Sequence, residues 1–129
     1  MAEAVARRDA GDVIEPASAG LYPLGRIAEL TIEILVANGY SVDGLSSKPV
    51  LCGAVRESSL IVNLSGAPID YLFSSAPPNL QNGQQLENWE VADPYGEDAA
   101  TYQRILEEIE ARVRQLASRL RTENRSAKV

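Results

Sequence analysis

The residues best placed for chemistry are an acid and the proline after it, in the stretch Trp89-Glu90-Val91-Ala92-Asp93-Pro94-Tyr95-Gly96. The spacing predicts a strand over 86–91, and Pro94 keeps Asp93 out of the helical region, so the carboxylate leaves that strand in an extended direction. An acid at the carboxyl end of a strand, just before a helix, lies where open α/β sheets hold their active sites. The alternative is that Asp93 only caps the next helix or starts a turn. On these residues alone both interpretations stay open.

Composition restricts the rest of the chemistry. The chain has no histidine and one cysteine, Cys52, which excludes histidine bases, Ser-His triads, an internal disulfide and multi-cysteine metal clusters. A formal net charge of −6 argues against binding to nucleic acid and to anionic membrane surfaces. No apolar run reaches the roughly 20 residues that span a bilayer, and the first residues show no signal pattern, so we expect a cytoplasmic protein. Carboxylates, Arg, Lys, Tyr, Ser and one thiol remain, and we expect neither a metal nor a cofactor.

The elements that position Asp93 follow from the spacing of the apolar residues. The clearest strand is the nearly continuous apolar run 60–64, which is typical of a parallel strand buried on both faces. Between the two core strands, 65–85 is rich in glycine and proline and is predicted to be mostly loop, of the kind that borders functional sites. The clearest helix carries an apolar stripe with a 3.6-residue period: Tyr102, Ile105, Leu106, Ile109, Val113, Leu116, Ala117 and Leu120. Its exposed side is expected to carry two i,i+4 ion pairs, Glu108 with Arg112 and Glu110 with Arg114.

Weaker signals fill the first half of the chain. Residues 2–9 are good helix formers, and 12–19 are predicted to form a short strand in which Pro16 requires an edge or a bulge. A helix is predicted over 24–38, with Gly39 as its left-handed stop, and a short helix over 49–56. This alternation predicts an α/β domain of three layers, α/β/α, around a parallel sheet. At 129 residues one domain is expected, over 1–121, with 122–129 as a frayed polar tail.

Several stretches in the right order resemble the low-molecular-weight protein tyrosine phosphatases, whose relatives include the thioredoxin-coupled arsenate reductases. Met1-Ala2-Glu3-Ala4 is similar to the helix start that follows the family's phosphate-binding loop. The other similar stretches are Ser18-Ala19-Gly20, Asn38-Gly39-Tyr40, Ser47-Lys48-Pro49-Val50, Ser59-Leu60-Ile61-Val62 and Asp93-Pro94-Tyr95-Gly96. The resemblance implies that Asp93 protonates the leaving phenolate and later activates water, and that Tyr95 borders an aryl substrate. The alternative for Tyr95 is that it simply packs on the sheet edge. One departure is Ser59, where the family usually has an acid.

A larger departure is the nucleophile. Family members open with a central strand and a Cys-x5-Arg-Ser loop, whose thiolate attacks phosphorus and whose arginine holds the phosphate. Cys52 is followed by arginine after only three residues, at Arg56, and no buried strand precedes it, so we interpret Cys52 as a structural thiol. Tyr22 is a pocket wall or plain packing. The resemblance thus implies a chain that lacks the central first strand, is truncated at its N-terminus, and is inactive as printed.

Three hypotheses follow. The first is a truncated phosphatase acting on a phosphorylated protein or a small aryl phosphate. The second is a non-catalytic interaction module that completes its sheet by homodimerisation or with a partner strand, because a missing central strand leaves backbone N–H and C=O groups unpaired. The third is an arsenate reductase, which requires further redox cysteines. Whether the chain is an enzyme stays open among them.

Overall fold

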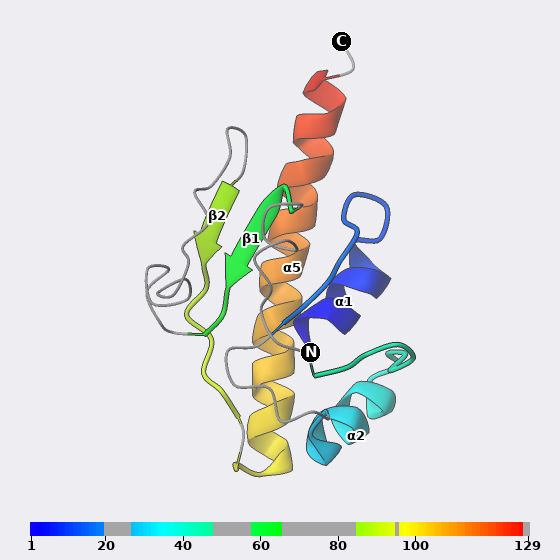
Figure 1. Cartoon of the computed structure of the whole chain (residues 1–129), viewed down its shortest axis with the longest axis vertical. Helices are drawn as coiled ribbons and strands as arrows, with labels where there is room; N and C mark the ends of the chain where they lie inside the picture. The colour runs from blue at the N-terminus through cyan, green and yellow to red at the C-terminus, as the bar shows by residue number, and fades with distance from the viewer. Residues whose placement is uncertain (20–26, 48–57, 66–84, 95, 128–129) are drawn as a thin grey trace. The chain divides into compact units, whose positions relative to one another are not determined.

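The computed structural model describes residues 1–19, 27–47, 58–65, 85–94 and 96–127. Within them lie the helices α1 (Ala2–Asp9), α2 (Glu29–Ala37) and α5 (Ala99–Ala127) and the strands β1 (Leu60–Asn63) and β2 (Gln85–Asn88) (Figure 1). The chain divides into two compact units. The helical unit comprises Met1–Ser18, Arg26–Ser46 and Pro94–Val129, and the strand unit comprises Ala19–Gly25 and Ser47–Asp93.

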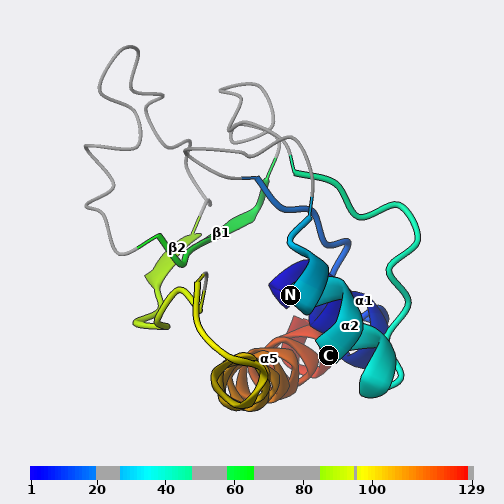
Figure 2. The same ribbon diagram turned by 90° about the horizontal axis from the view of Figure 1, so that it is seen from below.

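In the helical unit, α1 and α2 pack against α5. The view along α5 shows both shorter helices beside it (Figure 2). Seven of the eight apolar residues predicted to share one face of α5 are buried, from Tyr102 at 3% exposed to Ala117 at 1%. Val5 of α1 and Leu35 of α2 are fully buried as well. The predicted apolar stripe is therefore confirmed. The helix itself continues to Ala127, beyond the expected boundary at residue 121.

The helix over 2–9 is confirmed as α1, but the strand predicted over 12–19 is wrong. The backbone N–H groups of Val13 and Ile14 both donate to the carbonyl of Ala10, at 3.0 and 2.8 Å. These bonds close a turn directly after α1 and occupy the groups that a strand ladder would use. Pro16 lacks an N–H, so Val13, Ile14 and Pro16 have no N–H group available for a ladder.

α2 begins later than predicted and ends as predicted. Ala28 has an extended backbone, with ψ at 138°, so the helix starts at Glu29 and the expected helical conformation of Ile27 and Ala28 is wrong. At the other end Gly39 has a φ of +83°. The N–H of Gly39 donates to Val36 and that of Tyr40 to Leu35, the two bonds of a Schellman motif. Glycine is required there because a left-handed φ strains other residues.

The strand unit contains a parallel pair. β1 and β2 lie side by side with Leu60 opposite Gln85 and Asn63 opposite Asn88. The parallel pairing and the α/β class are confirmed. Burial of β1 on both faces is not, since Leu60, Ile61 and Val62 are only half-buried. The sheet of the described residues has two strands, β1 and β2.

The short helix predicted over 49–56 and most of the loop over 65–85 fall outside the described residues, as do Cys52 and Tyr22. None of the described helices combines the length and apolar character needed to cross a membrane. The cytoplasmic location stays a prediction.

Candidate functional site

The carboxyl end of the β1–β2 pair carries a cluster of polar side chains, Asn63, Ser65 and Asn88. Asn63 is 7% exposed, and its amide nitrogen donates to Asn88 Oδ1 at 2.9 Å. Its Oδ1 accepts two bonds from Ser65, one from the backbone N–H at 3.0 Å and one from the hydroxyl at 2.7 Å. The carboxyl ends of parallel strands are where α/β sheets hold ligands, and this cluster lies at that end of the β1–β2 pair.

The same edge fixes the start of the segment that leads to Asp93. The backbone N–H of Trp89 donates to the carbonyl of Asn63 at 3.0 Å, one residue past the end of β2. Trp89 is 8% exposed, and its indole nitrogen donates to Glu87 Oε1 at 3.2 Å. The N–H of Val91 then bonds back to the carbonyl of Trp89 at 3.1 Å, which closes a three-residue turn. The strand predicted over 86–91 therefore ends at Asn88, because this turn takes the chain out of the ladder, and the prediction is wrong for 89–91. Asp93 follows two residues after the turn with an exposed side chain.

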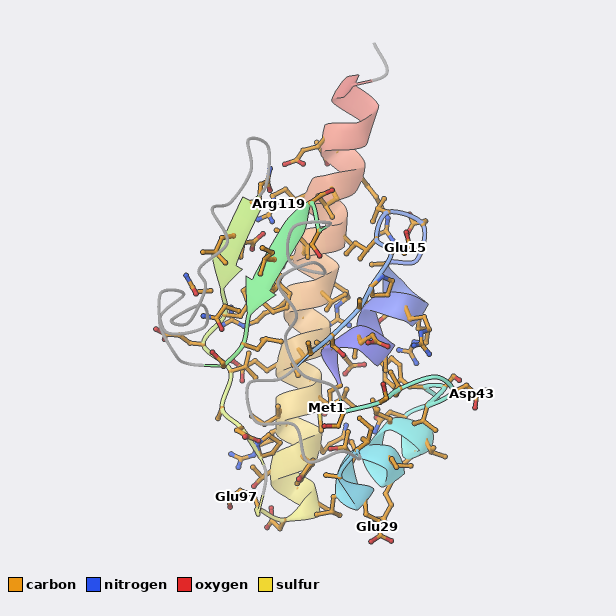
Figure 3. The ribbon with its side chains drawn as sticks, in the orientation of Figure 1. Met1, Glu15, Glu29, Asp43, Glu97 and Arg119 are labelled. Atoms are coloured by element: carbon orange, nitrogen blue, oxygen red, sulfur yellow. The ribbon has the colours of Figure 1, made fainter. Side chains whose placement is uncertain are left out.

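A different acid caps the helix after the Asp93-Pro94 corner. Asp98 Oδ1 accepts from the backbone N–H of Thr101 at 2.9 Å and from its hydroxyl at 2.8 Å, the bonds of an N-cap. These two bonds hold the pKa of Asp98 below its usual value. A separate turn precedes the cap, with the N–H of Glu97 bonded to the carbonyl of Pro94 at 2.9 Å and Gly96 at a φ of +85°. Glu97 lies beside the start of α5 (Figure 3). The interpretation of Asp93 as the cap of this helix is therefore wrong, because Asp98 occupies that position.

Two stretches of the family resemblance meet at Glu3 in the helical unit. Its side chain is 6% exposed, and its two oxygens accept from Ser18 Oγ at 2.7 Å and from Arg7 at 2.8 Å. Ser18 belongs to the stretch Ser18-Ala19-Gly20, and Glu3 to the stretch that opens α1. The contact holds the start of α1 to the chain segment that follows it.

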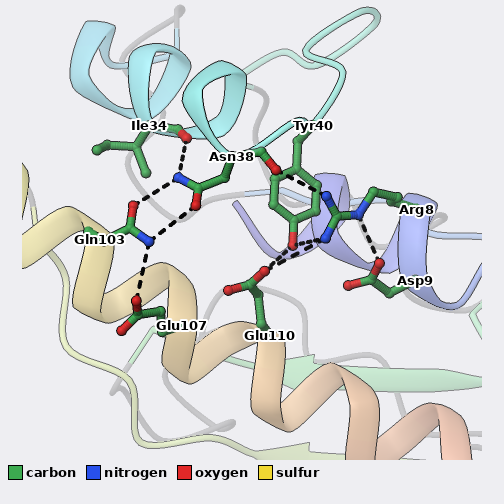
Figure 4. A network of polar contacts seen from close by, with 8 residues as sticks. All are labelled: Arg8, Asp9, Ile34, Asn38, Tyr40, Gln103, Glu107 and Glu110. Atoms are coloured by element: carbon green, nitrogen blue, oxygen red, sulfur yellow. Dashed lines mark hydrogen bonds and ion pairs between the residues drawn. The ribbon is translucent and has the colours of Figure 1, made fainter.

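A second polar network joins α1, α2 and α5 (Figure 4). The Tyr40 hydroxyl donates to Glu110 and accepts from Arg8 at 2.8 Å, and the Arg8 guanidinium lies 3.7 Å from the centre of the Tyr40 ring. Burial, followed by the bond to Glu110, raises the pKa of Tyr40. Beside this triad the amides of Asn38 and Gln103 bond to each other at 2.8 and 3.2 Å. The network clamps three segments that are distant in sequence.

This network also corrects one expected ion pair. Glu108 and Arg112 pair at 3.7 Å as predicted. Glu110, which was assigned to Arg114 on the exposed side, is partly buried and contacts Tyr40 and Arg8 instead, with Arg8 at 3.8 Å. An aromatic hydroxyl and a cation from another helix offer Glu110 a less hydrated setting than Arg114 offers on the surface.

Of the predicted site residues, only Asp93 falls among the described ones, and Tyr95 lies outside them. The amide cluster at the sheet edge was missed. Its sequence signal is Asn63, the one polar residue in the run 60–64, placed at the carboxyl end of the strand. Across the described residues, no group of three or more His, Cys, Asp or Glu side chains is arranged to hold a metal ion.

Comparison with known proteins identifies proteins that are similar to this chain. The family model described as low molecular weight phosphotyrosine protein phosphatase matches residues 1–126. A structure of a protein tyrosine phosphatase is 23% identical with a TM-score of 0.78, over 95% of this chain and 86% of that one. The tyrosine phosphatase Wzb from Escherichia coli K30, in complex with sulphate, is 18% identical with a TM-score of 0.76, over 92% and 87%. At these identities the two structures show the shared fold.

An arsenate reductase is also similar. The thioredoxin-dependent arsenate reductase of Corynebacterium glutamicum is 28% identical with a TM-score of 0.74, over 95% of this chain and 55% of that one. No curated protein is significantly similar to the chain in sequence.

Proposed function

Because this chain belongs to the low molecular weight phosphotyrosine protein phosphatase family, we propose that it carries the proton-transfer part of a phosphomonoester hydrolase site, with Asp93 as the acid. The observation that supports this role most is the position of Asp93. It lies five positions after Asn88, the last residue of the parallel strand β2, its side chain is exposed, and the cap of the following helix is Asp98.

In the proposed reaction a thiolate attacks phosphorus and the phosphorus–oxygen bond to the phenol breaks. Asp93 donates its proton to the departing phenolate oxygen, and its carboxylate then takes a proton from the water that hydrolyses the thiophosphate. Tyr95, by resemblance, borders the aryl group of the substrate. A phosphorylated protein or a small aryl phosphate fits this chemistry.

Residues 1–129 contain no Cys-x5-Arg motif to supply the nucleophile of that reaction. The one cysteine, Cys52, has arginine after three residues instead of five. We therefore expect residues 1–129 alone to show no cysteine-dependent hydrolysis of aryl phosphates. Vanadate-sensitive turnover by these residues, abolished by Cys52→Ser, would contradict this expectation.

The role of Asp93 is tested by fusing a strand and Cys-x5-Arg loop from a family member to residue 1. The fusion is assayed with p-nitrophenyl phosphate, whose phenolate leaves without help, and with phenyl phosphate, whose phenolate requires protonation. Removing a general acid costs about 10²–10⁴-fold in rate. We expect Asp93→Asn to lower kcat by that order with phenyl phosphate and by much less with p-nitrophenyl phosphate.

Glu90→Gln is the matched control, since it removes an exposed carboxylate three positions before Asp93. It should leave both rates unchanged. Equal losses with the two substrates for Asp93→Asn, or no loss at all, would overturn the assignment. Reduction of arsenate by the fusion, without phosphatase activity, would favour the arsenate reductase alternative instead.

A second candidate function is an interaction module. The supporting observation is that, within the described part of the chain, β1 forms a ladder with β2 only. An exposed edge of a sheet can accept a strand from another molecule. This candidate predicts that residues 1–129 sediment as a homodimer or with a partner. It also predicts that the Ile61→Pro variant sediments as a monomer. A monomer by sedimentation velocity at every concentration would remove the homodimer.

A further inference from the structure

We propose that Asn63 is a positioning residue that fixes the segment from Trp89 to Asp93 through its amide contacts at the end of the sheet. The inference rests on the proposed function for what Asp93 does, but its structural part concerns only where the segment is held. All the residues involved belong to the strand unit.

Asn63 connects three pieces of chain. Its side chain bonds Asn88 on the neighbouring strand and Ser65 on the exit from β1. Its backbone carbonyl accepts the N–H of Trp89, the first residue after β2. Movement of Asn63 therefore changes both the register at the strand ends and the start of the segment that leads to Asp93.

The burial of the Asn63 amide indicates that its hydrogen bonds do more than fill space at the end of the strand. A buried amide costs free energy unless its bonds are satisfied, whereas an apolar residue at the same place would continue the run 60–64 without that requirement. Amide bonds have defined directions, and apolar contacts do not. The polar pair at the register position Asn63–Asn88 thus specifies one geometry at the strand ends.

The path from this anchor to the acid is short and constrained. Trp89 is buried, and the Val91 N–H bonds back to its carbonyl, so the chain reverses within three residues before reaching Asp93. A reacting group that is displaced by about 1 Å loses on the order of 10²-fold in rate. Loosening the anchor should therefore be felt at Asp93 even though Asn63 contacts no substrate in this proposal.

The structural part is tested by amide hydrogen exchange of residues 1–129. Asn63→Leu removes the side-chain bonds and keeps the backbone carbonyl. We expect the Trp89 and Val91 amides to exchange about tenfold faster or more, while the ladder amides of β1 and β2 keep their protection. Asn63→Asp should restore protection, since a carboxylate accepts the Ser65 bonds and the Asn88 amide can turn to donate to it.

Two further variants keep the test decisive if Asn63→Leu unfolds the unit. Asn88→Ala alters an exposed residue and removes one bond, so a smaller acceleration at Trp89 and Val91 is expected. Gln85→Leu is the matched control, because it replaces an exposed amide at the opposite end of β2 and should change neither amide. Unchanged exchange at Trp89 and Val91 in Asn88→Ala, or failure of Asn63→Asp to restore protection, would overturn the proposal.

The functional part uses the fusion enzyme described above. Asn63→Leu should lower kcat more than it raises KM, and more with phenyl phosphate than with p-nitrophenyl phosphate. In an Asp93→Asn background it should cost nothing further, because residues that act as one unit are non-additive. If amide exchange becomes faster in Asn63→Leu but Asp93→Asn does not change either rate, Asn63 still positions the segment and Asp93 is not the acid. If Asp93→Asn lowers kcat as expected and the losses of Asn63→Leu and Asp93→Asn add in the double variant, Asn63 is not a positioning residue for Asp93.

Discussion

Tyr40→Phe tests whether one hydroxyl holds the helical unit together. The hydroxyl donates to Glu110 on α5 and accepts from Arg8 on α1 at 2.8 Å, and the ring carrying it is 4% exposed. Phenylalanine keeps the buried ring and its contact with the guanidinium, so the substitution removes only the two hydrogen bonds. The ring itself would be tested by Tyr40→Ala, which should cost about 3–5 kcal/mol.

The two hydrogen bonds contribute differently to the free energy of unfolding because their charged partners differ in exposure. A hydrogen bond to a charged group contributes roughly 1.5–3 kcal/mol. Arg8 has a side chain 45% exposed, which water solvates once the hydroxyl is gone, so its bond contributes little. The Glu110 side chain is only 18% exposed and loses a donor where water enters less easily. We therefore expect Tyr40→Phe to lower the free energy of unfolding by about 2 kcal/mol, mostly through Glu110.

The assay is urea unfolding followed by circular dichroism at the helix band, because α5 belongs to the same unit as Tyr40. A double-mutant cycle with Glu110→Ala, which removes the acceptor, should give a coupling energy of about 1–2 kcal/mol. Arg112→Gln, which breaks the exposed pair with Glu108, is the control and should cost under about 0.5 kcal/mol. Tyr40→Phe within about 0.3 kcal/mol of the wild type, with no coupling to Glu110, would refute this account.

Two further predictions concern the charges at the ends of the helices. Asp98→Ala should lower the thermal midpoint of the helical unit and Asp98→Asn should restore most of it, because asparagine also caps helices. Hydrogen bonds from Thr101 lower the pKa of Asp98, and hydrogen bonds from Arg121 lower the pKa of Asp12. Both carboxylates therefore stabilise the fold above about pH 4. That contribution is lost as the pH falls through their pKa values in the folded protein. The difference in thermal midpoint between the wild type and Arg121→Gln should accordingly be constant near neutral pH and shrink below about pH 4; a difference that grows with acidity would contradict it.

Local signals in the sequence were sufficient for some elements. The stripe from Tyr102 to Ala117 predicted a helix because its period is a property of one continuous segment. Gly39 predicted the end of α2 because only glycine takes a left-handed φ readily. The segment 12–19 failed for the opposite reason. Its β-branched residues favour a strand, but the turn bonds to Ala10 depend on where α1 ends.

The contacts that define both polar clusters are non-local. Tyr40 and Glu110 are 70 positions apart, and Asn63 and Asn88 are 25 apart. No periodicity links such pairs, so the sequence could identify Asn63 as an interruption in an apolar run but not its partner. Pro94 singled out Asp93 in the sequence because a proline constrains the residue before it, whereas the cap of α5 is Asp98. The role of Asp93 as an acid stays a prediction.

The charges of the chain also bear on what must recognise a phosphate. Four of its arginines already bond carboxylates: Arg7 with Glu3, Arg8 with Asp9, Arg112 with Glu108 and Arg121 with Asp12. A phosphate ester that bound at one of these four arginines would have to displace its acid, against a formal net charge of −6. Backbone N–H groups and an unpaired arginine, the parts that a Cys-x5-Arg loop provides, avoid that competition. We therefore expect the phosphate of a substrate of this family member to be bound by groups that do not already hold a carboxylate.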